Sequence, residues 1–190
     1  MTNFWQGYQV RLRALEPVDI EELVRDTPDS DAERAEDAVT FPQSSGRARA
    51  QLEGLASREQ TDDSCFLAIA TNENTLAGVI NTFDCDRRTG CFKYALVIRA
   101  PLRRRGYACE AITLLLRHYF RERRYQKCTV LVYAFNAPSI RLHEGLGFTL
   151  EGRLRRMVYT NGRHYDELYY GITAEEFADF DPPEELPEAG

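Results

Sequence analysis

The segment 100–110, which reads APLRRRGYACE, combines residue types that could bind an anion. Arg103, Arg104 and Arg105 come directly before Gly106, where a helical pattern begins. The first amides of a helix have no partner within it and carry partial positive charge, so they favour an anion such as pyrophosphate. Gly106 lets the backbone approach a ligand closely, and Ala108 is too small to block it. The alternative is that the arginines form only a solvated basic surface.

The segment 136–148, NAPSIRLHEGLGF, holds a second group of reactive side chains. Asn136 is a candidate helix cap, and the four-residue spacing of Ser139 and His143 places both on one helix face. No GxSxG elbow and no evident acid partner are present, so the pair does not indicate a Ser-His-Asp hydrolase. Neither GxxxxGK[ST] nor GxGxxG occurs, so the chain has neither a P-loop nor the glycine-rich motif of dinucleotide-binding proteins.

Hydrophobic periodicity predicts the elements that position these segments. Strands are expected over 8–15, 65–70, 76–83, 91–98 and 128–133, and a long hairpin from Phe148 turns at Asn161-Gly162. Helices are expected from Pro17, over 45–57, from Gly106 and over 138–146. This order predicts an α/β (α+β) fold: a single mixed, mostly antiparallel, twisted sheet with helices on both faces and no dividing linker.

Composition narrows the classes of protein. The 190 residues carry 24 Lys and Arg against 30 Asp and Glu, a net charge of −6, which disfavours a nucleic-acid partner. A hydrophobic fraction of 43% excludes a disordered chain. No apolar run is long enough to span a bilayer, and the first residues lack a signal-peptide pattern. These two features predict that no membrane is a partner, and five cysteines without a CxxC pair predict a cytoplasmic protein without a metal site.

The last residues differ in composition from the rest. From Ala174 the chain carries seven acidic residues and no basic one, together with Pro182, Pro183 and Pro187. We therefore predict a domain over 1–172 and an acidic, flexible tail over 173–190.

Taken together, the two segments resemble the GCN5-related N-acetyltransferase (GNAT) superfamily. The run from Arg103 to Ala108 is similar to that family's Q/R-x-x-G-x-G/A acyl-CoA loop, and Asn136 and Gly147-Phe148 match its later landmarks. The predicted element order matches over about residues 8–172. Within this superfamily, the chain looks closest to the ribosomal-protein N-terminal (RimJ/RimL-type) acetyltransferases. The sequence motifs that support this are GYACEA at 106–111, the NxxS motif from Asn136 to Ser139, and the stretch 151–172. The segment 136–148 also resembles antibiotic-modifying enzymes of the phosphinothricin type.

The resemblance implies acetyl-CoA as the acyl-donor cosubstrate and an amine as the acceptor. It implies that the central strands splay apart, so that the strand end Leu96, Val97 and Ile98 pairs with the pantetheine arm of CoA. It assigns the CoA phosphates to the loop formed by Arg103, Arg104, Arg105, Gly106, Tyr107 and Ala108. Asn136 is expected to bind the pantetheine arm, close to Ser139.

The implied reaction is acetyl transfer by direct attack of a neutral amine on the thioester. Many family members carry a Tyr at the fifth residue before the Gly-Phe phenylalanine as proton donor to the thiolate, and His143 stands there in this chain. Ser139 matches a serine that RimL-type enzymes are thought to use at the thiol, so Ser139 is our first choice of donor and His143 the second. A helix-surface role for His143 is the alternative. The base stays open among Asp84, Asp86, Glu167 and Tyr170.

The sequence is compatible with several acceptors and with other functions. The acceptor could be a peptide or protein N-terminus, a polyamine or an antibiotic amine. The domain could bind CoA without catalysis, or it could contact nucleic acid through Arg99 and Arg103–Arg105. A homodimer is expected from the resemblance alone.

Overall fold

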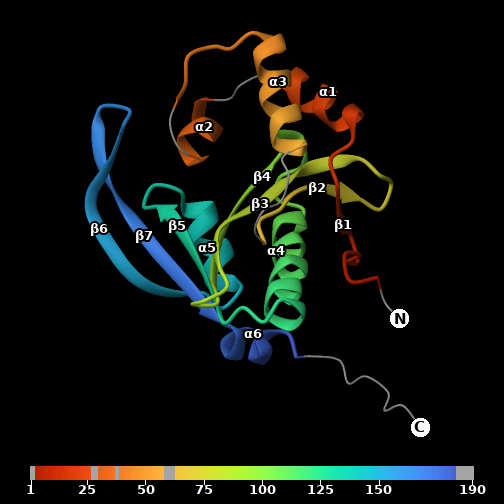
Figure 1. Ribbon diagram of the computed structural model, residues 1–190. Helices are drawn as coiled ribbons and strands as arrows, with labels where there is room; N and C mark the ends of the chain where they lie inside the picture. The colour runs from red at the N-terminus through yellow and green to blue at the C-terminus, as the bar shows by residue number, and fades with distance from the viewer. Residues whose placement is uncertain (1–2, 27–29, 37–38, 58–62, 183–190) are drawn as a thin grey trace.

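The computed structural model describes residues 3–26, 30–36, 39–57 and 63–182. Its centre is a seven-stranded sheet with the order β1-β2-β3-β4-β5-β7-β6 (Figure 1). The strands are β1 Val10–Arg13, β2 Phe66–Thr71, β3 Leu76–Asp86, β4 Cys91–Ile98, β5 Lys127–Tyr133, β6 Thr149–Thr160 and β7 Arg163–Thr173. Only the pair of β4 with β5 is parallel, and every other neighbouring pair is antiparallel. The predicted mixed, mostly antiparallel sheet is confirmed.

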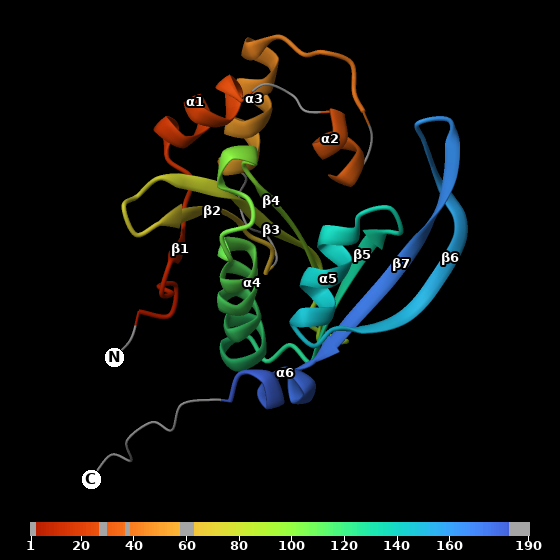
Figure 2. The same ribbon diagram turned by 180° about the vertical axis from the view of Figure 1, so that it is seen from behind.

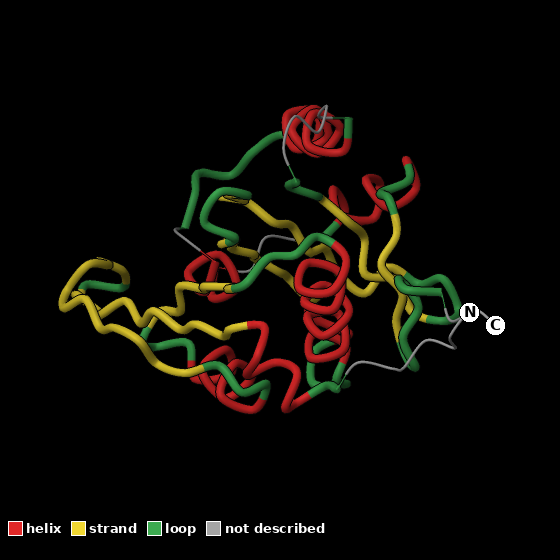
Figure 3. The backbone as a smooth tube through the Cα atoms, turned by 60° about the horizontal axis from the view of Figure 1, so that its bottom comes forward, coloured by secondary structure: helices red, strands yellow, loops and turns green. Residues whose placement is uncertain are grey.

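Helices lie on both sides of this sheet. They are α1 Pro17–Arg25, α2 Ser30–Glu36, α3 Ser45–Ala56, α4 Tyr107–Arg117, α5 Ala137–Gly145 and α6 Ala174–Phe180, with a short 3-10 helix over Ala100–Leu102 and a π-helical turn over His118–Glu122. Figure 2 shows α4 and α5 side by side on one face of the sheet, and Figure 3 shows strands between α3 and α4. Figures 1 and 2 place α2 between α3 and the β6–β7 hairpin.

The two halves of the sheet part in the middle. β4 and β5 pair only where Cys91–Lys93 meets Lys127–Thr129. Beyond Lys93, β4 stays paired with β3 as far as Ile98, and β5 stays paired with β7 as far as Tyr133. Each strand therefore follows its other neighbour, and the expected splay of the central strands is confirmed.

The core lies between the sheet and α4. The α4 residues Ala111, Ile112 and Leu115 are fully buried, as the helical periodicity predicts. The Phe92 ring of β4 stacks on Tyr119 at a centroid distance of 4.2 Å. Because Tyr119 lies in the π-helical turn that continues α4, this packing orients α4 relative to β4 and so positions the N-terminus of α4.

The sequence prediction of the C-terminal region needs one correction. Residues 174–180 form helix α6, which begins with a capping box between Thr173 and Glu176, where we predicted a flexible tail. Phe177 is 1% exposed, and Asp181 accepts hydrogen bonds from Arg117 and Arg121. A buried aromatic ring and a paired carboxylate hold this segment, whereas acidic composition alone indicates solvent. Residues 183–190 lie outside the described residues, and the 1–172 domain limit stays a prediction.

No helix among the described residues is long and apolar enough to cross a membrane.

Candidate active site

The loop before α4 has the backbone that an anion site requires. A 3-10 helix over Ala100–Leu102 leads into exposed residues, and Gly106 adopts a φ of +87° as the N-cap of α4. The amide of Glu110 donates to the Gly106 carbonyl at 3.2 Å, so the first amides of α4, which precede Glu110, have no acceptor within the helix. A Cβ at position 106 would be strained and would lie 3.3 Å from Gln9 Nε2. The structure thus brings the predicted loop residues 103–108 together at one helix N-terminus.

The arginines around this loop have different surroundings. Arg103 Nε donates to the Ile98 carbonyl at 2.9 Å, and Arg105 donates to the Pro101 carbonyl at 3.4 Å. Arg99, by contrast, forms ion pairs with Glu22 and with Asp26, whose Oδ2 lies 2.8 Å from Arg99 Nε. Arg99 is therefore bound to α1, and its proposed place in a basic surface for nucleic acid is not supported.

Glu110 is a contributor to this region that the sequence did not indicate. Its carboxylate accepts hydrogen bonds from the backbone amides of Gln9 and Val10 at 2.8 and 2.9 Å, and also from Tyr8. An acidic side chain in the first turn of a helix also interacts favourably with the helix dipole. Glu110 thus connects the first turn of α4 to the residues that lead into β1.

The strand end Leu96–Ile98 lies at the open side of the split. These residues pair with β3 on one edge, and β5 does not pair with them on the other. Gly78 permits the close approach of β3, because an added Cβ would lie 2.0 Å from the Val97 carbonyl oxygen. One edge of β4 therefore presents backbone groups without a strand partner, which is what a ligand with amide groups could use.

Asn136 and Ser139 form the start of α5. The Asn136 side-chain oxygen accepts the Ser139 amide at 3.2 Å, so the predicted N-cap is confirmed. The Asn136 side-chain nitrogen donates to the Ala35 carbonyl at 3.4 Å, which brings α2 next to the start of α5. Ser139 is half-buried on the first turn, just beyond the end of β5.

His143 is buried, with 4% of its surface exposed, so the alternative of a helix-surface residue is wrong. Its Nδ1 lies 2.8 Å from the Ser139 carbonyl oxygen and 3.3 Å from Ser139 Oγ, and its Nε2 lies 2.8 Å from the Tyr94 hydroxyl. A carbonyl can only accept, so this network assigns the proton to Nδ1, and the Tyr94 hydroxyl donates to Nε2. Burial lowers the pKa of His143 and favours its neutral form.

Tyr94 is another site residue that the sequence analysis missed. It is the first β4 residue after the parallel pairing with β5 ends, and its side chain points to the same face as Phe92. Its bond to His143 joins β4 to α5 across the split. Burial raises the pKa of Tyr94 well above its ordinary value, so the hydroxyl keeps its proton. The alternating pattern of β4 could have indicated a buried tyrosine there, but not its distant partner.

The candidate bases occupy four different environments. Asp84 lies 3.1 Å from Lys93 Nζ, and Asp86 accepts the Arg88 amide within a turn. Tyr170 is buried and donates to Glu144 at 3.0 Å. Glu167 accepts the Tyr169 hydroxyl at 3.3 Å beside Tyr133, the last residue of β5. Among the described residues, no group of three His, Cys, Asp or Glu side chains is placed to hold a metal ion.

The comparisons with known proteins agree with this geometry. The family described as "Acetyltransferase (GNAT) domain" matches residues 9–149, a stretch that contains the loop, the split and α5. The chain therefore belongs to the GNAT acetyltransferases, and it is an acetyl-CoA-dependent N-acetyltransferase.

Individual relatives support the same class. The chain is 42% identical over 175 residues to the "SPbeta prophage-derived uncharacterized N-acetyltransferase YokL" of Bacillus subtilis, covering 92% of this chain and 96% of that one. It is 25% identical over 105 residues to the "Putative ribosomal N-acetyltransferase YdaF" of the same organism, covering 55% and 57% of the two chains. Among solved structures, a spermidine N-acetyltransferase from Vibrio cholerae, in complex with CoA and spermine, shares the fold with a TM-score of 0.77 at 20% identity, covering 90% and 99%.

Proposed function

We propose that this enzyme acetylates the N-terminal amine of a peptide or protein, in the manner of RimJ/RimL-type enzymes. The observation that carries acetyl transfer is the split between β4 and β5, which opens between the N-terminus of α4 and Ser139. The similarity to a relative named for ribosomal N-acetylation supports the peptide acceptor. The five cysteines, which form no disulfide with one another, support a reducing cytoplasm as the location.

The described residues fit acetyl-CoA along this split. The amides of residues 104–108 and the side chains of Arg103, Arg104 and Arg105 would hold the pyrophosphate and adenosine phosphates. The unpaired edge at Leu96–Ile98 would pair with the pantetheine amides. Asn136 Nδ2, whose contact with Ala35 is long at 3.4 Å, would donate to the same arm. These assignments use Gly106 and Ala108 as the positions where the backbone must be open.

The chemistry then follows from charge. The neutral amine nitrogen attacks the thioester carbonyl carbon, the C–N bond forms and the C–S bond breaks, and the amine proton leaves to a base through water. The departing thiolate accepts a hydrogen bond from the Ser139 hydroxyl, and if that proton is transferred, the proton released by the amine returns to Ser139 through water. Because Nδ1 of His143 carries a proton, it cannot accept from Ser139, and the Ser139 proton is left to point at the sulfur. Ser139 is thus the proposed donor, and His143 positions it.

Glu167 is proposed as the general base, which accepts the amine proton through a water molecule. Its carboxylate has neither the lysine partner of Asp84 nor the turn amides of Asp86. It lies across from Tyr133, next to the end of β5 from which the chain enters α5. A water molecule between Glu167 and the acceptor amine would complete the proton path.

The test is a thiol-release assay with acetyl-CoA and a panel of acceptors. The panel holds short peptides with free N-termini, the same peptides with blocked N-termini, spermidine and a phosphinothricin-like amino acid. We expect turnover with free peptides and none with blocked ones. Turnover confined to spermidine or to the amino acid would overturn the peptide acceptor and favour the small-amine alternative, to which the wording of segment 136–148 also points.

A further inference from the structure

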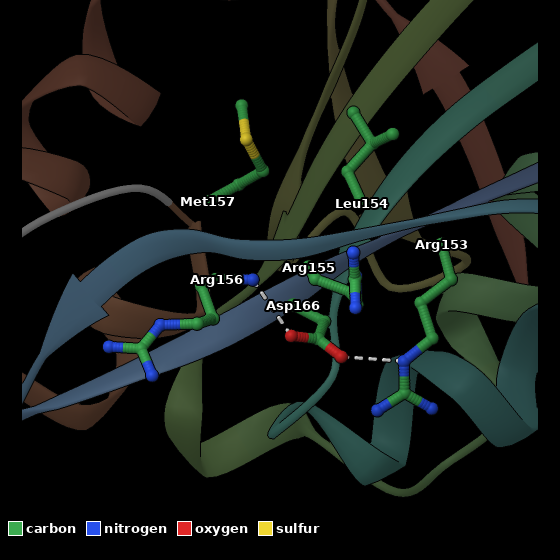
Figure 4. Close-up of a pocket in the computed structure, with 6 residues that line it drawn as sticks. All are labelled: Arg153, Leu154, Arg155, Arg156, Met157 and Asp166. Carbon is green, nitrogen blue, oxygen red and sulfur yellow. Dashed lines mark hydrogen bonds and ion pairs between the residues drawn. The ribbon is translucent and has the colours of Figure 1, made fainter.

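The β6–β7 hairpin carries a concentration of positive charge that catalysis does not use. Arg153, Arg155, Arg156 and Arg163 are all exposed on it, although the whole chain has a net charge of −6. A pocket on this hairpin is lined by Arg153, Leu154, Arg155, Arg156, Met157 and Asp166 (Figure 4). Three arginines against one carboxylate leave the pocket with a net charge of 3 − 1 = +2.

A bulge in β6 creates this pocket. Leu154 pairs with Glu167 and Val158 pairs with Tyr165, so residues 155–157 of β6 face the single residue Asp166 of β7. Arg156 adopts a φ of +59°, which a non-glycine residue rarely does. Regular alternation would send Arg155 and Arg156 to opposite faces, and the bulge re-aims them. A second register shift lies between Leu150 and Gly152 of the same strand, but only the bulge at 155–157 places several arginines together.

Asp166 fixes the bulge from below. Its carboxylate accepts the Arg156 amide at 2.8 Å and the Arg153 Nε at 2.6 Å, as the dashed lines in Figure 4 show. These two hydrogen bonds, with the Arg156 amide first, lower the pKa of Asp166, so it stays ionised and holds the loop. Leu154 and Met157 point to the other side of the ribbon (Figure 4). Asp166 therefore holds the Arg153 guanidinium and the backbone at Arg156 in place, whereas charges on an edge strand are often only mobile solubilising groups.

The pocket is connected directly to the candidate active site. The amide of Ala134 donates to the Asp166 carbonyl at 3.0 Å, and Ala134 lies two residues before Asn136. A peptide whose N-terminal amine reached the thioester beside Ser139 would leave this site past the end of β5, where Asp166 lies. Its following residues would then run along the hairpin.

We propose that the bulge pocket binds acidic side chains of the acceptor peptide, just downstream of the amine that is acetylated. This proposal rests on the proposed peptide acceptor and names its class: an N-terminus followed by Asp or Glu. Arginine suits this task because its planar group can bind a carboxylate through two parallel hydrogen bonds.

The first experiment measures binding, independently of turnover. Three fluorescent peptides share one sequence and a blocked N-terminus, and differ only in carrying Glu, Gln or Lys at residues two to five. Anisotropy is recorded with the wild type, with Arg155→Glu, and with Arg124→Glu as a matched charge change on an exposed arginine outside the hairpin. We expect the Glu peptide to bind the wild type about tenfold more tightly than the Gln peptide at low salt. Arg155→Glu should remove this preference, and Arg124→Glu should retain it.

The second experiment uses the same peptides with free N-termini in the thiol-release assay. The expected result is a lower KM for the Glu peptide with kcat nearly unchanged, and loss of that difference in Arg155→Glu. Equal binding and equal KM for the three peptides would overturn the pocket while leaving peptide acetylation intact, and the arginines would then be solubilising charges of an edge strand. If no free peptide turns over but the blocked Glu peptide still binds through Arg155, the pocket stands as an acidic-peptide site and the proposed function fails.

Discussion

The starts of α4 and α5 lie on either side of the same split, but backbone groups form one site and side chains form the other. The α4 start works through its backbone: unpaired amides, a glycine with a φ of +87° and a small Ala108. The α5 start works through side chains: Asn136 caps the helix, and Ser139 is held next to a buried His143–Tyr94 pair. A site formed by backbone groups depends on a few adjacent residues, whereas a site formed by side chains depends on partners that lie far away in the chain.

The largest effect should come from the α5 side. Ser139→Ala removes the proposed donor to the thiolate, and we expect kcat to fall by about a hundredfold, within the range for a lost proton donor. KM for acetyl-CoA should change little, because the Asn136 cap and the Ser139 amide remain. Steady-state kinetics by thiol release measures both values, with the exposed Ser45→Ala as the control. A kcat within threefold of the wild type would remove Ser139 from the mechanism.

A substitution at the start of α4 should weaken acetyl-CoA binding and leave the chemical step nearly unchanged. Gly106→Val places a branched side chain at a positive φ, which costs about 1–2 kcal/mol, and it fills the space above the first amides. We expect KM for acetyl-CoA to rise at least about tenfold with kcat held within a few fold. Gly46→Val is the control, because nothing lies within 4 Å of a Cβ there. An unchanged KM would show that the phosphates bind elsewhere.

A smaller effect tests whether His143 positions or donates. Tyr94→Phe leaves the buried Nε2 without its donor, and we expect the free energy of unfolding to fall by about 1–3 kcal/mol with a modest loss of kcat. In His143→Gln, the side-chain amide can still bond Tyr94, and activity should stay above that of His143→Ala. Urea denaturation and kinetics on all three variants measure this. Equal inactivity of the Gln and Ala variants would favour His143 as the donor.

The smallest effect is a pH dependence of stability. Burial lowers the pKa of His143 in the folded protein below about 6.5, the value in the unfolded chain. Between these two values the unfolded chain binds more protons, so stability is fully present above pH 6.5 and declines as the pH falls below it. His118, whose pKa burial also lowers, adds in the same direction. Urea midpoints between pH 5 and 7.5 should therefore slope less steeply in His143→Gln than in the wild type. Identical slopes would contradict a neutral, buried His143.

The same contrast explains what the sequence could predict. The bounds of β4, the glycine loop, the helix around Ser139 and the Asn161-Gly162 hairpin follow from local patterns, and the structure has them. Tyr94 as the partner of His143, the ion pairs of Arg99 with α1 and the burial of Phe177 depend on contacts between distant segments. The β6 bulge was also missed, because its brace, Asp166, lies on the next strand. Local periodicity carries no information on such pairs.

Glu110 has a consequence for the beginning of the chain. Its carboxylate holds the amides of Gln9 and Val10 while its backbone closes the first turn of α4. Any ligand that steadies this turn should also steady those amides, because opening one end disrupts the bonds of the other. Hydrogen exchange at residues 8–10 thus becomes a reporter of cofactor occupancy. An affinity tag placed just before these residues would disturb the same hydrogen bonds to Glu110.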